Sequence, residues 1–89
     1  MDIILTIHAT EKLKTKEAKS LGIDKRKIIS TVKQPITTDK TLNPYRSIGK
    51  LTDMLSLAVI WKKEGGIIKI ITFYPAEKGR YESKILRRR

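Results

Sequence analysis

Two apolar segments on either side of Glu64-Gly65-Gly66 constrain the fold more than any other feature of the sequence. The first, Met54 to Lys63, carries apolar residues at both odd and even positions, which suits a strand in the middle of a sheet. The second, Ile67 to Tyr74, follows a Gly-Gly pair that is typical of a tight turn, and Pro75 should end it. We therefore expect an antiparallel hairpin at the centre of the fold.

Shorter segments on both sides of the hairpin extend the expected sheet. Tyr45 to Leu51 has the alternation of a strand, and Tyr81 to Leu86 suits an edge strand. The apolar run from Ile3 to Ile7 is compatible with a short strand at the start of the chain. Residues 35–44 are polar, rich in threonine and without a period, so an exposed connection is expected there.

The N-terminal third of the chain has helical spacing instead. One helix is expected from His8 to Leu21, where Gly22 favours a C-terminal cap, and a second from Asp24, a suitable N-cap, to the region of Pro35. The sequence thus predicts an α+β fold in a single domain over residues 1–89, with two N-terminal helices packed on a three- to four-stranded twisted antiparallel sheet.

Charge is the feature that bears most on function. The 89 residues include 20 Lys and Arg against 9 Asp and Glu, a formal net charge of +11 that makes a polyanion the expected partner. Cysteine is absent, which excludes disulfides and thiolate metal sites, and the longest apolar run is too short to cross a bilayer as a helix. We expect a cytoplasmic location without membrane association.

A single histidine, His8, limits the available chemistry. It excludes metal sites built from histidine pairs, and the sequence has no phosphate-binding glycine loop, dinucleotide fingerprint or serine nucleophile elbow. We therefore expect neither a metal nor a cofactor. Cleavage of RNA without a metal remains compatible, because the 2′-hydroxyl of the substrate is the nucleophile and the protein needs only a base, a proton donor and cations.

Structural roles compete with catalytic ones for several of these residues. His8 serves equally well as a helix cap or a solvated side chain, and the alternation of Thr72 with Tyr74 is more typical of cross-strand packing than of catalysis. Trp61, at the end of the apolar run, suits packing better than base stacking.

Two short motifs, considered together, resemble a known family. They are His8-Ala9-Thr10-Glu11-Lys12-Leu13 and Thr72-Phe73-Tyr74-Pro75, with a Leu-Gly-Ile-Asp turn at Leu21 to Asp24 and an Ile-x-x-x-Val-x-x-Pro stretch from Ile28 to Pro35 between them. The chain is similar in this order of motifs to small domains of the RelE/ParE-like toxin superfamily, which often have a His-Ala-x-x-Arg-Met-like helix start and a Thr-x-Tyr strand end. Here Lys12 replaces the usual Arg, so the planar fork that clamps a phosphate is lost.

The resemblance implies two helices on a twisted antiparallel sheet and metal-free endoribonuclease activity controlled by an antitoxin. The expected partners are RNA or DNA and an acidic antitoxin protein, with the chain a monomer or a homodimer. Two alternatives are a non-catalytic basic nucleic-acid-binding module and a basic protein that docks an acidic partner. The expected catalytic residues are His8, Tyr74 and Arg80, and the expected nucleic-acid-binding residues are Lys12, Arg46, Thr72, Tyr81, Arg87 and Arg88.

Overall fold

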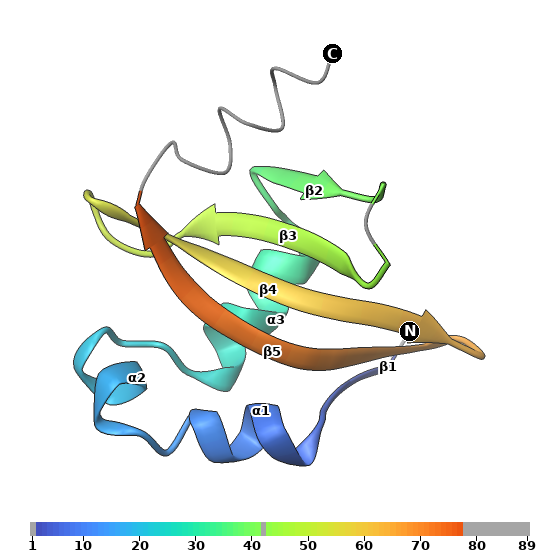
Figure 1. Ribbon diagram of the computed structural model, residues 1–89, viewed down its shortest axis with the longest axis horizontal. Helices are drawn as coiled ribbons and strands as arrows, with labels where there is room; N and C mark the ends of the chain where they lie inside the picture. The colour runs from blue at the N-terminus through green and yellow to red at the C-terminus, as the bar shows by residue number, and fades with distance from the viewer. Residues whose placement is uncertain (1, 42, 78–89) are drawn as a thin grey trace.

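A twisted sheet forms the frame of the molecule in the computed structural model, which describes residues 2–41 and 43–77 (Figure 1). Within these residues the sheet has five strands in the order β1-β5-β4-β3-β2. The strands are β1 (Asp2–Leu5), β2 (Thr37–Asp39), β3 (Tyr45–Lys50), β4 (Leu55–Glu64) and β5 (Ile67–Glu77).

The central hairpin is confirmed. Strands β4 and β5 pair antiparallel around Gly65 and Gly66, both of which have positive φ, and β4 is the middle strand of the sheet. Pro75, however, does not end β5: it lies opposite Leu57, and the strand continues to Glu77. The pairing of β5 with β1 ends at Ile70, so Pro75 lies in a part of β5 that pairs on one side only among the described residues, where a missing backbone donor is tolerated.

The predicted sheet architecture is wrong in two respects. The sheet is mixed, because β1 runs parallel to β5 with Leu5 opposite Ile70, and it gains β2 from residues that were expected to form an exposed connection. Parallel pairing joins segments far apart in the sequence, and no local pattern specifies it. The strand expected at Tyr81 to Leu86 lies outside the described residues.

Strand β2 is built from polar residues that pair with β3. Thr38 Oγ1 lies 2.9 Å from Ser47 Oγ, and Asp39 forms an ion pair with Arg46 at 3.7 Å. Its residues have low apolar content, so hydrophobic alternation gives no sign of this strand.

The helical region contains three short helices in the described residues rather than two. The expected first helix is divided into α1 (Ile7–Lys12) and α2 (Lys16–Ser20), followed by α3 (Lys25–Lys33). The break comes where Thr15 acts as a new N-cap and accepts a hydrogen bond from the Ala18 amide at 3.2 Å. To cap α2, Thr15 must adopt an extended backbone, which prevents α1 from continuing through this residue. None of the helices in the described ranges is long and apolar enough to cross a membrane.

The start of α3 is as predicted. Asp24 Oδ1 accepts a hydrogen bond from the Lys27 amide at 2.8 Å, and Gly22 has a φ of 71°. Ile23 and Ile28, which flank the cap, are both buried in the core, as expected for a hydrophobic staple.

The core lies between the helices and one face of the sheet. Trp61 packs there, as predicted, with its ring centroid 5.0 Å from that of Tyr45 in an edge-to-face arrangement. Its indole Nε1 donates to Ser47 Oγ at 2.8 Å, which satisfies both buried polar groups. The buried core residues are Ala9, Ala18, Ile23, Ile28, Val32, Leu51, Leu57, Val59, Trp61, Ile70 and Phe73.

Helix α3 approaches β3 most closely at Gly49. A Cβ atom on this residue would lie 2.8 Å from Thr31 Oγ1 and 3.0 Å from Thr31 Cγ2. The Thr31 hydroxyl is held in place because it donates to the Lys27 carbonyl at 2.8 Å. Glycine at position 49 therefore sets the distance between α3 and the sheet.

We expect Gly49→Ala to lower the free energy of unfolding by about 1–3 kcal/mol, because the added methyl group overpacks a contact that cannot relax freely. Urea denaturation of wild type, Gly49→Ala, Thr31→Ala and the double variant measures the coupling energy between positions 49 and 31. The cost of Gly49→Ala should be smaller in the Thr31→Ala background. An equal cost in both backgrounds would contradict the close contact.

Charges near the hairpin turn give a pH-dependent contribution to stability. Glu64 Oε1 lies 3.0 Å from Lys69 Nζ and 3.5 Å from Lys62 Nζ. The hydrogen bond from Lys69, followed by the charge of Lys62, lowers the pKa of Glu64 below its usual value of 4.5. Since the folded pKa is lower than the unfolded one, the stabilisation is present above pH 4.5 and is lost as the pH falls through the folded pKa.

We expect Glu64→Gln to reduce stability slightly at neutral pH, and the difference from wild type should disappear below the folded pKa of Glu64. Thermal unfolding at neutral and acidic pH compares the two proteins. A difference of unchanged size in acid would exclude the ion pairs as its cause.

Candidate functional site

Three of the sequence-predicted residues meet on β5. His8 Nε2 and Lys12 Nζ lie 3.2 Å and 3.3 Å from the same atom, Thr72 Oγ1. His8 and Lys12 are four residues apart on α1, so they share one face of the helix. The two sequence motifs, more than sixty positions apart, are thus brought into direct contact.

The start of α1 is fixed on the same strand. Thr6 is the N-cap of α1, and its hydroxyl oxygen accepts a hydrogen bond from the Ala9 amide at 3.2 Å. Its backbone amide donates to the Ile70 carbonyl at 3.0 Å, and its hydroxyl donates to the Ile71 carbonyl at 3.1 Å. One threonine therefore caps α1 and joins it to the strand that carries Thr72.

A β-bulge determines which way Thr72 faces. Ile60 lies opposite Thr72 but Trp61 lies opposite Ile70, so Ile71 is an extra residue in β5. Ile70 and Phe73 are both buried in the core on either side of this irregularity. In a regular strand Ile70 and Thr72 would share a face, but the extra residue shifts the alternation between them.

Lys12 is positioned by more than the threonine hydroxyl. Its Nζ lies 5.3 Å from the centroid of the Phe73 ring, within the range of a cation–π interaction. A hollow of about 140 Å³ adjoins it, with Ala18, Ile23 and Phe73 among its lining residues. Among residues 2–41 and 43–77, no acidic side chain forms an ion pair with Lys12 or His8. The half-buried Lys12 and the exposed His8 therefore lie close together without an acidic partner among those residues.

Of the other predicted site residues, Tyr74 and Arg46 lie on the sheet within the described part of the chain. Tyr74 is partly buried on β5, opposite Ala58 and two residues beyond Thr72. Arg46 lies on β3, which β4 separates from β5, and its largely buried side chain pairs with Asp39. The residues Arg80, Tyr81, Arg87 and Arg88 lie outside the described residues.

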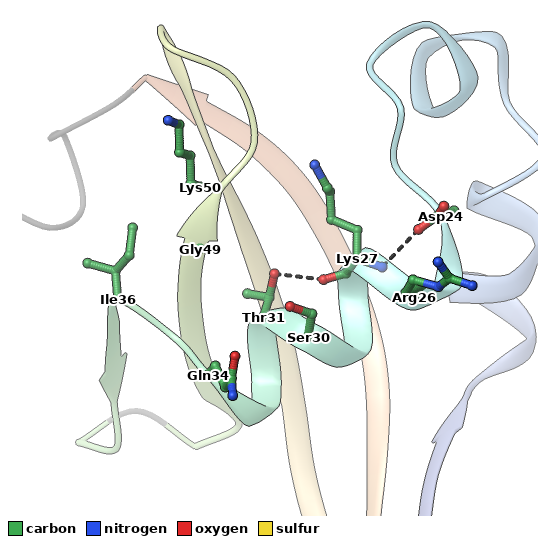
Figure 2. Close-up of a pocket in the computed structure, with 9 residues that line it drawn as sticks. All are labelled: Asp24, Arg26, Lys27, Ser30, Thr31, Gln34, Ile36, Gly49 and Lys50. Carbon is green, nitrogen blue, oxygen red and sulfur yellow. Dashed lines mark hydrogen bonds between the residues drawn. The ribbon is translucent and has the colours of Figure 1, made fainter.

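A second hollow, which the sequence did not predict, lies between α3 and β3 (Figure 2). It has a volume of about 450 Å³, and Lys27 and Lys50 extend from its two sides. The available signal was the basic run at residues 25–27, but only the pairing of β3 in the sheet shows that Lys50 lies across from it.

No cluster of three or more His, Cys, Asp or Glu side chains able to hold a metal ion occurs in the described ranges. Comparison of the chain with protein-family models gives no match, and searches of curated proteins and of solved structures give none either. The resemblance to RelE/ParE-like toxins therefore rests on the sequence motifs alone.

Thr72→Val tests whether the cluster contributes to folding. The substitution removes the hydroxyl but keeps the shape and strand preference of the side chain, so we expect the free energy of unfolding to fall by about 1 kcal/mol or less. Thr37→Val, in another strand, is the matched control. A much larger loss in Thr72→Val alone would show that His8 and Lys12 serve mainly to hold α1 on the sheet.

Proposed function

We propose that the protein is a metal-independent endoribonuclease that cleaves single-stranded RNA by attack of the 2′-hydroxyl on the adjacent phosphate. The observation that carries the proposal is the convergence of an exposed imidazole and an ammonium group on one threonine hydroxyl. A base and a cation are two of the groups that the reaction requires from a protein, besides a proton donor. The net charge of +11 supports a polyanionic substrate.

In this mechanism the His8 imidazole accepts the proton of the 2′-hydroxyl as the 2′-oxygen bonds to phosphorus. The bond to the 5′-oxygen breaks, and that oxygen takes a proton from Tyr74 or from water, leaving a 2′,3′-cyclic phosphate and a 5′-hydroxyl. Lys12 stabilises the negative charge that builds on the phosphate oxygens, and Thr72 positions both side chains. Arg80 is proposed as a second cation at the same phosphate.

The ion pair of Arg46 with Asp39 argues against a role for Arg46 in this step, because its charge is already balanced on the far side of β4. We further propose that the protein acts in the cytoplasm, as a monomer or a homodimer, and that an acidic antitoxin-like protein restrains it. The high positive charge is what supports such a partner.

Incubation of the protein with single-stranded RNA in excess chelator tests the proposal. Wild type should produce fragments ending in 2′,3′-cyclic phosphate, and His8→Ala should lower the rate by about 100-fold or more, as expected for loss of a general base. Lys12→Met, which keeps the aliphatic stem over Phe73, should also lower it, whereas Lys14→Met is the matched control.

A folded wild-type protein without activity, or cleavage unchanged in both His8→Ala and Tyr74→Phe, would refute the proposal. An inactive His8→Ala protein prepared in parallel controls for trace ribonuclease.

A non-catalytic nucleic-acid-binding module is the second candidate, favoured by the charge alone. Such a protein would bind RNA or DNA without cleaving it, and its affinity would fall with salt at a log-log slope of about 0.7 to 0.9 per phosphate contact. Binding that is independent of salt would count against both candidates and favour docking of an acidic protein.

A further inference from the structure

The groove between α3 and β3 is lined by more cations than carboxylates: Arg26, Lys27 and Lys50 against Asp24. Lys27 on α3 and Lys50 on β3 extend on opposite sides of it, as Figure 2 shows. The nearby carboxylates are otherwise engaged: Asp24 caps α3, and Asp53 lies 3.8 Å from Lys50 in a pair that is largely exposed on both sides. An exposed pair of this kind is weak and exchanges readily for a stronger anion.

Polar donors line the groove between these two lysines. Ser30 follows Lys27 by three residues on α3, and Gln34 is the C-cap of this helix; both residues are exposed. Within the described part of the chain, neither side chain makes a hydrogen bond, and Lys27 Nζ forms no ion pair. Ile36 adds an exposed apolar surface at the edge.

The floor of the groove is rigid. Gly49 and the buried Thr31 meet there, and the Thr31 hydroxyl is fixed on the Lys27 carbonyl. Lys27 and Ser30 on α3 and Lys50 on β3 therefore project from two elements that are in direct contact. Such an arrangement of ammonium, hydroxyl and amide groups matches the oxygen-rich backbone of a nucleic acid strand, with apolar surface for a base or sugar.

We propose that the α3–β3 groove binds the phosphate backbone of single-stranded nucleic acid. It is a separate contact surface from the His8 cluster: the two share no residue, and β4 separates β3 from β5. The inference rests on the proposed role of the protein as one that acts on or binds nucleic acid, but not on catalysis. The groove holds the strand, and the chemical step takes place at the His8 cluster.

The test is binding of a fluorescein-labelled 2′-O-methyl RNA about a dozen nucleotides long, which fits the site sizes of single-strand binders and cannot react through its 2′-oxygen. Fluorescence anisotropy is measured over a salt series. The double variant Lys27→Gln/Lys50→Gln is compared with Lys19→Gln/Lys63→Gln, which removes the same charge from exposed positions elsewhere.

The groove variant should bind roughly tenfold more weakly than the control at low salt, and its log-log salt slope should be smaller by about 1.4, the value for two lost single-strand contacts. Gln34→Glu, a nearly isosteric change that places a negative charge in the groove, should weaken binding while circular dichroism shows a folded protein. Equal affinities and slopes for the groove and control variants would overturn the assignment.

Cleavage measurements separate this inference from the proposed endoribonuclease activity. If wild type cleaves RNA, Lys27→Gln/Lys50→Gln should raise KM and leave kcat within about twofold, because lost binding outside the reacting centre acts on KM. If wild type does not cleave RNA but the groove variants still lose binding, the endoribonuclease proposal fails and the groove assignment stands. A groove variant with lowered kcat and unchanged affinity would overturn the assignment.

Discussion

The bulge at Ile71 is the constraint on which the candidate site depends. Strand β5 places Ile70 and Phe73 in the core, and an extra residue between them changes the alternation so that Thr72 turns to α1. In a regular strand, residues three apart face opposite sides, so these two apolar residues could not share the core. The same irregularity that completes the core therefore leaves the Thr72 hydroxyl in contact with His8 and Lys12 instead of in the core.

Features that depend on residues close together in the sequence could be predicted, whereas features that depend on distant residues could not. The hairpin, the cap at Asp24 and the packing of Trp61 are set by adjacent residues or by one apolar run, and these were predicted correctly. The parallel pairing of β1, the polar strand β2 and the break at Thr15 were not, because each depends on a partner far away or on competition between two local structures.

The candidate site shows the same division. The meeting of His8 and Lys12 with Thr72 agrees with the two motifs that were paired in the sequence. Arg46 looked equally suitable by charge, but its neighbour across the strands, Asp39, was hidden in a segment that appeared to be a loop. The α3–β3 groove could not be predicted from the sequence, because Lys27 and Lys50 are brought to the same hollow only by the packing of Gly49 against Thr31. The positions of charged residues relative to one another thus depend on tertiary contacts that charge counts do not contain.

The parallel pairing of β1 with β5 also has a consequence for the order of events during synthesis. Strand β1 leaves the ribosome before its partner strand and Thr72, which lie more than sixty residues later in the chain. Contacts of such separation form late, because the intervening chain must be ordered first. The cluster of His8, Lys12 and Thr72 therefore exists only once β5 has emerged. A nascent fragment that ends before β5 would contain His8 and Lys12 but not the Thr72 hydroxyl that both side chains contact.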